Sequence, residues 1–135
     1  MAVIARGWSV EGDRWELDVD GDAGQLSTML RVTTADGRRL WGVGSAGPAR
    51  PPVARLDIVT GSNDVGPGHL VVRVGTAVHA VVVRLSDGTR EDLVLHDVLA
   101  VPALRVAALA FPRHLDIHRI DLYGADGAVL DGAVG

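Results

Sequence analysis

Apolar and polar residues alternate along most of this chain, and the alternation breaks repeatedly at turn-forming residues. From Trp15 to Asp20, apolar and acidic residues alternate strictly, which is typical of a strand with one buried face. Three alternating runs break at an Asp-Gly pair and then resume, at Asp36-Gly37, Asp87-Gly88 and Asp126-Gly127. Glycine accepts a positive φ without steric cost, so Asp-Gly between strands is a strong hairpin signal. The pattern predicts mostly antiparallel sheet.

The same reading predicts a strand wherever an apolar run lies between turn signals. These strands cover residues 8–10, 14–19, 26–34, 38–43, 53–60, 70–74, 78–85, 89–96, 104–111, 116–123 and 128–130. Residues 104–111 are also the one plausible helix, but Pro102 and Pro112 bracket them and they lack an amphipathic stripe, so we expect a strand. Turns recurring every 8 to 12 residues favour two packed layers. We therefore expect an all-β protein, an antiparallel β-sandwich of about ten short strands, Ig-like or barrel-like.

The chain of 135 residues suits a single domain, residues 1–135. Within it, residues 1–43 have the pattern of a four-strand meander. Residues 44–52 hold three of the six prolines and are expected to be a connector, because proline cannot donate to a regular hydrogen-bond ladder. Residues 53–135 would form the main sheet. The sequence leaves open whether the meander forms its own sheet or completes one with the later strands.

Charge and composition limit the classes of partner that the chain is expected to bind. All 13 basic residues are arginine, 17 residues are acidic, and the net charge is −4. The arginines are spread along the chain, so the sequence shows no basic face for nucleic acid. No apolar run approaches the roughly 18 residues of a membrane-spanning helix, and no signal peptide is evident at the start. We expect a soluble, cytoplasmic protein that binds neither nucleic acid nor membrane.

The second half of the chain carries a recognisable order of features. An alternating run closes on Leu85-Ser86-Asp87-Gly88, residues 98–111 are followed by Pro112, and a last strand region spans residues 121–130. From about residue 70 to 131, this order resembles a β-sandwich domain of uncharacterised proteins from high-GC bacteria. The resemblance implies the fold and no particular activity.

Two motifs resemble known binding loops. Residues 42–47 match the Gly-x-Gly-x-x-Gly fingerprint of dinucleotide-binding proteins, but prolines follow where a helix N-terminus should hold the pyrophosphate, so we expect no cofactor. Asp18, Asp20 and Asp22 stand at alternate positions before a turn, as at the start of a calcium loop. Ala23 and Met29 occupy the positions where that loop needs Gly and Glu. We therefore favour a solvated acidic hairpin and keep a weak Ca²⁺ site as the alternative.

The sharpest chemical pattern is His114-Leu115-Asp116-Ile117-His118. On an extended strand His114, Asp116 and His118 would share a face, and two imidazoles with a carboxylate can bind Zn²⁺ or Fe²⁺. Against this, Pro112 indicates a turn at His114, and the apolar parity changes at Ile120, which implies a bulge near His118. We therefore favour an exposed polar face without metal and keep the metal site as the alternative.

Catalysis by a nucleophile has little support, because there is no cysteine and no serine in a strand-elbow-helix motif. The three tryptophans lie within the first 41 residues, and Trp41, beside the expected connector, is the candidate for a sugar-binding platform. We interpret the chain as a non-catalytic protein-binding or structural module without a cofactor, acting by self-association or with a protein partner. The alternatives are a metal-dependent enzyme or metal-binding protein centred on His114, Asp116 and His118, and a carbohydrate-binding module using Trp41 and the acidic loop with Ca²⁺.

Overall fold

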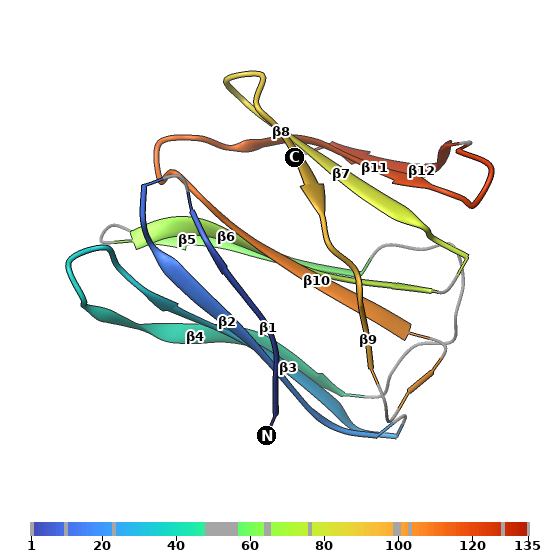
Figure 1. Ribbon diagram of the computed structural model, residues 1–135, viewed down its shortest axis with the longest axis horizontal. Helices are drawn as coiled ribbons and strands as arrows, with labels where there is room; N and C mark the ends of the chain where they lie inside the picture. Colours follow the sequence, from blue (N-terminus) through green and yellow to red (C-terminus); the bar gives the residue numbers. More distant parts are fainter. Residues whose placement is uncertain are drawn as a thin grey trace.

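The computed structural model describes residues 2–9, 11–22, 24–47, 57–63, 66–75, 77–98, 101–102, 104–127 and 129–134. Within these ranges the chain forms strands and turns, and no helix (Figure 1). The strands are β1 Ala2–Trp8, β2 Arg14–Gly21, β3 Leu26–Thr33, β4 Arg39–Gly47, β5 Asp57–Asn63, β6 Gly66–Gly75, β7 Ala80–Leu85, β8 Arg90–Leu93, β9 His96–Asp97, β10 Leu104–Phe111, β11 Ile117–Tyr123 and β12 Val129–Val134.

These strands pair into three antiparallel sheets of four. The first sheet has the order β1-β2-β3-β4, the middle sheet β5-β6-β10-β9, and the third sheet β12-β11-β7-β8. Figure 1 shows the middle sheet between the other two. The all-β, antiparallel, sandwich-like fold is thus confirmed, but the layers number three where the turn spacing favoured two. The four-strand meander predicted from residues 1–43 corresponds to the first sheet, β1 to β4, which continues to Gly47.

Two separate hydrophobic cores explain the third layer. Between the first and middle sheets, Trp15, Leu17 and Leu30 pack with Val71 and Val106. Between the middle and third sheets lies a second core, which contains Leu70, Val72, Leu109, Val83 and Leu122. Successive residues of β6 and β10 therefore enter opposite cores. A strand buried on both faces needs no polar alternation, which is why residues 106–111 of β10 form a continuous apolar run.

A buried polar contact also joins the first and middle sheets. Arg73 on β6 is only 7% exposed, and its Nη2 donates to Thr28 Oγ1 on β3 at 2.9 Å. The same nitrogen lies 3.5 Å from the backbone oxygen of Leu26. Burial of a guanidinium is costly unless its N–H groups find acceptors. Because the acceptors lie on β3, this contact favours one placement of the middle sheet relative to the first.

The three Asp-Gly pairs form hairpin turns, as predicted, and the structure shows how. Gly37, Gly88 and Gly127 have φ values of 89°, 88° and 78°, while no described residue other than glycine has a positive φ. Each glycine therefore ends a three-residue loop of the type I plus bulge kind. The aspartate contributes by its side chain: Asp87 Oδ1 accepts the backbone N–H of Thr89 at 2.9 Å.

Several predicted boundaries were wrong. The first strand is β1, which ends at Trp8 where the sequence placed a strand over residues 8–10. Strand β4 continues to Gly47, so the connector cannot begin at residue 44, and residues 48–56 lie outside the described ranges. Residues 61–63 and 66–68 belong to β5 and β6 and not to a turn. The strand expected over residues 89–96 is divided between β8 in the third sheet and β9 in the middle sheet.

Close packing at Gly7 generates a first prediction. A Cβ atom at Gly7 would overlap the indole of Trp15, which is buried in the first core. We expect Gly7→Ala to lower the free energy of unfolding by about 1–3 kcal/mol, because an overpacked core must shift its side chains. Gly24→Ala is the control, since its Cβ would meet one carboxylate oxygen of Asp22 at 3.3 Å. Urea unfolding measures the free energy of unfolding of both variants. Equal values for Gly7→Ala and Gly24→Ala would contradict the close packing at Gly7.

Burial of His69 generates a prediction about pH. His69 lies on β6, is 6% exposed, and its pKa is lowered from the usual 6.5 by desolvation. Below pH 6.5 the unfolded chain therefore binds a proton that the folded protein does not, and stability falls as the pH drops. We expect His69→Gln to flatten this pH dependence. Denaturant unfolding between pH 5 and 7 measures it; an unchanged slope in the variant would contradict the burial of a neutral imidazole.

Candidate functional site

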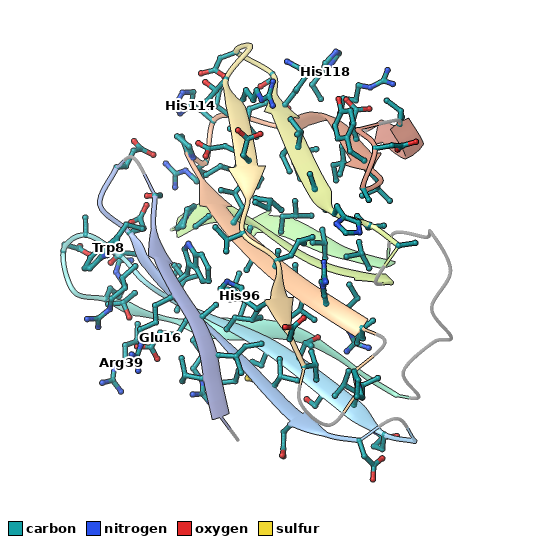
Figure 2. The ribbon with its side chains drawn as sticks, turned by 45° about the vertical axis from the view of Figure 1, so that its right-hand side comes forward. Trp8, Glu16, Arg39, His96, His114 and His118 are labelled. Atoms are coloured by element: carbon teal, nitrogen blue, oxygen red, sulfur yellow. The ribbon has the colours of Figure 1, made fainter. Side chains whose placement is uncertain are left out.

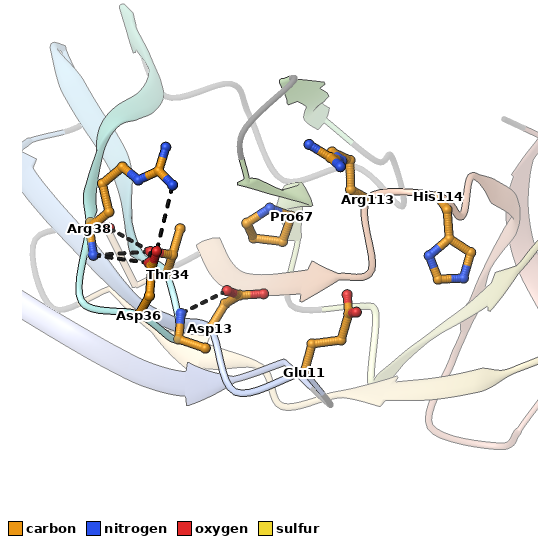
Figure 3. Close-up of a pocket in the computed structure, with 9 residues that line it drawn as sticks. Glu11, Asp13, Thr34, Asp36, Arg38, Pro67, Arg113 and His114 are labelled. Carbon is orange, nitrogen blue, oxygen red and sulfur yellow. Dashed lines mark hydrogen bonds and ion pairs between the residues drawn. The ribbon is translucent and has the colours of Figure 1, made fainter.

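Two turns of the first sheet, the start of β6 and the segment between β10 and β11 surround a hollow of about 430 Å³ at one end of the molecule (Figure 3). The turn between β1 and β2 contributes Glu11 and Asp13, and the turn between β3 and β4 contributes Asp36 and Arg38. The segment between β10 and β11 supplies Arg113 and His114, while Pro67 comes from the start of β6. We call this hollow the end pocket. Loops held by a rigid sheet scaffold commonly carry binding functions.

Asp13 is held rigidly at the edge of the end pocket. Its Oδ2 accepts a hydrogen bond from Ser9 Oγ at 3.0 Å, and its Oδ1 accepts the backbone N–H of Ala35 at 3.1 Å. Ser9 Oγ in turn accepts the backbone N–H of Asp13 at 3.1 Å. Asp13 therefore joins two neighbouring hairpins of the first sheet and keeps its carboxylate in one orientation.

Asp36 is the second fixed carboxylate of the end pocket. Its Oδ1 accepts a hydrogen bond from the hydroxyl of Thr34, and its Oδ2 lies 3.6 Å from Arg38 Nη2. The Thr34 hydroxyl, followed by the backbone N–H of Arg38, lowers the pKa of Asp36 below 3.8. The group is thus ionised at neutral pH with its orientation set by its own turn.

His114 is the one member of the predicted metal triad that lines the end pocket. It lies in the turn after Pro112, whose carbonyl accepts the N–H of Leu115 at 3.0 Å. Nearby Asp87 has a lowered pKa, caused first by its hydrogen bonds with Thr89 and, in smaller part, by attraction to His114. The turn that the sequence predicted at His114 is therefore present.

Asp116 and His118 lie elsewhere. Asp116 precedes β11, and its backbone N–H donates to Ser86 Oγ at 3.0 Å. His118 lies in β11 at a register shift between Ile117 and Arg119, which confirms the predicted bulge. Figure 2 shows His114 and His118 well apart, so the shared strand face that the metal hypothesis needs does not form. Among the described residues, no three His, Asp or Glu side chains are grouped so that they could hold a metal ion.

The acidic run of β2 is also divided between different surroundings. Asp18 is 1% exposed, and its Oδ2 forms an ion pair with Arg31 Nη1 at 2.6 Å. Asp20 is exposed near the end of the strand. Asp22 Oδ1 accepts the backbone N–H groups of Gly24 and Gln25, so its role is to close the turn. This environment matches a structural hairpin better than a calcium loop, whose carboxylates must converge on one ion.

The two remaining sequence candidates lie on β4. The Gly-x-Gly-x-x-Gly residues 42–47 belong to this strand, which does not match the strand-to-helix turn of a dinucleotide site. Trp41 lies in the same strand, but its side chain is outside the described part of the structure. Its proposed role as a sugar platform stays a prediction.

Sequence reasoning missed a basic surface on the outer side of the first sheet. Strand pairing places Trp8 opposite Arg14, Arg14 opposite Thr33, and Thr33 opposite Arg39 in one row. In the next row, Arg6 and Arg31 lie on either side of Glu16. We call the outward side chains of Arg6, Trp8, Arg14, Glu16, Arg31, Thr33 and Arg39 the basic face; Figure 2 shows Trp8, Glu16 and Arg39 along this side of the sheet.

The basic face contains a shallow hollow of about 190 Å³. Arg14, Arg31 and Arg39 line it from three strands, together with Thr33 and Glu16. Within the described structure Glu16 pairs with Arg6 at 3.5 Å, whereas Arg39 forms no ion pair. Trp8 is 68% exposed at the edge, with the guanidinium of Arg14 6.0 Å from its ring centre. Three guanidiniums around a hydroxyl are suited to binding a carboxylate or another oxyanion.

Comparison with protein-family models, with curated proteins and with solved structures found no match to this chain. Nor does the described part of the chain contain a helix with the length and hydropathy of a membrane span. The assignment of function therefore depends on the geometry of the end pocket and the basic face.

The turn chemistry of the end pocket can be tested by titration. Thr34→Val removes the hydroxyl that donates to Asp36, so we expect the pKa of Asp36 to rise toward 3.8 while that of Asp87 stays unchanged. Thr89→Val should do the reverse, because the Thr89 hydroxyl is the main cause of the lowered pKa of Asp87. Carboxyl ¹³C chemical shifts followed by NMR measure both groups. The same response of Asp36 to both variants would contradict this assignment.

Proposed function

We propose that the chain is a non-catalytic binding module that docks an acidic segment of a partner protein on the basic face. The observation that carries the proposal is the convergence of Arg14, Arg31 and Arg39 on one hollow beside the exposed Trp8. Arginine and tryptophan are the residues most often found at the energetic centres of protein interfaces. An exposed tryptophan otherwise leaves a large apolar side chain in water, which is unfavourable.

The charge of the surface supports an acidic partner. The outer side of the first sheet carries four arginines, the exposed Asp20 and two further carboxylates, Glu16 and Asp18, a local net charge of +1, whereas the whole chain carries −4. Both carboxylates already have an arginine partner, Glu16 with Arg6 and Asp18 with Arg31. Arg14 and Arg39 remain to meet carboxylates of a partner. Such pairing speeds association and selects against basic partners.

The row spacing suits an extended segment. Neighbouring strands lie about 4.8 Å apart, so Arg14 and Arg39, separated by one strand, stand roughly 10 Å apart along the row. In an extended peptide, alternate side chains point to one face about 7 Å apart. A segment with glutamate or aspartate at alternate positions can therefore reach both arginines, and a neighbouring apolar side chain can cover Trp8.

Binding of a labelled oligoglutamate peptide tests this proposal. We expect saturable binding by fluorescence anisotropy that weakens as salt is added, because exposed charges are screened. Arg39→Glu should weaken binding by about tenfold or more, through loss of a charge-assisted contact and added repulsion. Arg90→Glu is the matched control, because Arg90 is exposed on the third sheet and its reversal changes the net charge equally.

The outcomes separate clearly. Weaker binding by Arg39→Glu alone supports docking at the basic face. Equal weakening by both variants would mean that only the net charge matters, and would overturn the proposal. Absence of saturable binding to the unaltered protein at low salt would overturn it as well.

A further inference from the structure

The end pocket separates its charges in space. Figure 3 shows Glu11 and Asp13 along one side of the hollow and Arg113 on the opposite side, with His114 at one end. Glu11 and Asp13 come from the turn between β1 and β2, and Arg113 comes from the segment between β10 and β11. Asp36 and Arg38, from the turn between β3 and β4, also line the hollow but pair with each other at 3.6 Å. Because Glu11 and Asp13 lie on a turn of the first sheet and Arg113 lies on the segment that joins the middle and third sheets, the scaffold holds them on different sides of an open volume.

From this arrangement we propose that the end pocket binds a small zwitterion of the free α-amino acid class. The ammonium group would lie between Glu11 and Asp13, and the carboxylate would accept hydrogen bonds from Arg113 and His114. The proposal is independent of docking at the basic face, because the two hollows share no lining residue.

The acidic side is preorganised for an ammonium group. Asp13 is fixed through one bond on each oxygen, from Ser9 and from Ala35, and each oxygen keeps a further lone pair. The side chain of Glu11 is exposed and makes no hydrogen bond or ion pair with the described residues. Glu11 can therefore close onto a bound ammonium without breaking a contact, while Asp13 supplies the fixed acceptor. A site that is already ordered loses less entropy on binding.

The opposite side presents donors of the right kind. A guanidinium carries five N–H donors in a planar fork that matches a carboxylate. The imidazole of His114 is exposed and can donate one N–H whether it is neutral or protonated. Pro67, which also lines the hollow, adds an apolar surface against which an aliphatic side chain could pack.

The size of the hollow and the presence of both charge signs in it favour a free amino acid over a peptide. The hollow of about 430 Å³ lies within the 300–1,000 Å³ typical of small-molecule sites. In a free α-amino acid the ammonium and the carboxylate are attached to the same carbon, so both can enter one small pocket. In a polypeptide they are separated by the whole chain, so only one of the two could enter the hollow.

A titration followed by ¹⁵N–¹H NMR tests the proposal, with glycine, methylamine and acetate as the probes. We expect glycine to shift the amide signals of Glu11, Ala35 and His114 along a saturable curve. Methylamine and acetate, which each carry half of the zwitterion, should bind about tenfold more weakly or worse, because each loses one set of charge-assisted bonds. Amino acids with aliphatic side chains are then compared with glycine.

Variants identify the site. Glu11→Gln and Arg113→Gln should each weaken glycine binding by about tenfold. Glu91→Gln and Arg90→Gln, on β8 of the third sheet, are the matched controls and should bind as the unaltered protein does. The NMR spectrum itself reports whether each variant is folded.

Three results would overturn the proposal. Non-saturating shifts with glycine would mean that there is no site. Acetate binding as tightly as glycine would mean a simple anion site. Unchanged glycine affinity in Glu11→Gln would place any binding elsewhere. None of these results bears on oligoglutamate binding at the basic face, so the two proposals fail separately.

Discussion

Double burial of the middle sheet is the constraint on which the rest of this structure depends. Strands β6 and β10 pair along the whole length from Leu104 to Phe111, and their side chains enter the two cores alternately. Among the described residues, neither outer sheet has a second core of its own, so each is stabilised by covering one face of these two strands. Burial of apolar surface on both faces is the main favourable term that holds three layers together. The charged side chains of the basic face and the end pocket therefore lie on an outer sheet face and on the turns.

The sequence predicts local structure well and long-range pairing poorly. Hairpins at Asp36-Gly37, Asp87-Gly88 and Asp126-Gly127 depend on residues adjacent in the chain, and all three are present. The strand at residues 104–111 was also predicted, because Pro102 and Pro112 exclude a longer helix. The third layer was not predicted. The sequence of a strand that is buried on both faces is apolar on both faces, so it does not show which sheet packs on which face. The division of residues 89–96 between two sheets leaves no local signal either.

The candidate functional residues also differ in this way: those in local sequence patterns were predicted, and those brought together by strand pairing were not. His114 was singled out from a local pattern and does line the end pocket, but the strand geometry assumed for Asp116 and His118 is replaced by a turn and a bulge. The basic face was missed because Arg14, Arg31 and Arg39 lie far apart in the sequence and meet only through strand pairing. The available signal was parity: each occupies an outward position on an alternating strand. Glu11 carried no signal of its own, since nothing in its turn shows what lies across the pocket.

Native-state hydrogen exchange tests the central claim, that the middle sheet supports the other two. The amides of β6 and β10, such as those of Val72 and Ala107, should exchange more slowly than any others, and only through global unfolding. Their apparent opening free energies should equal the free energy of unfolding measured with denaturant. Faster exchange in β6 and β10 than in β2 and β3 would contradict the claim, because the first sheet would then be stable without the middle one.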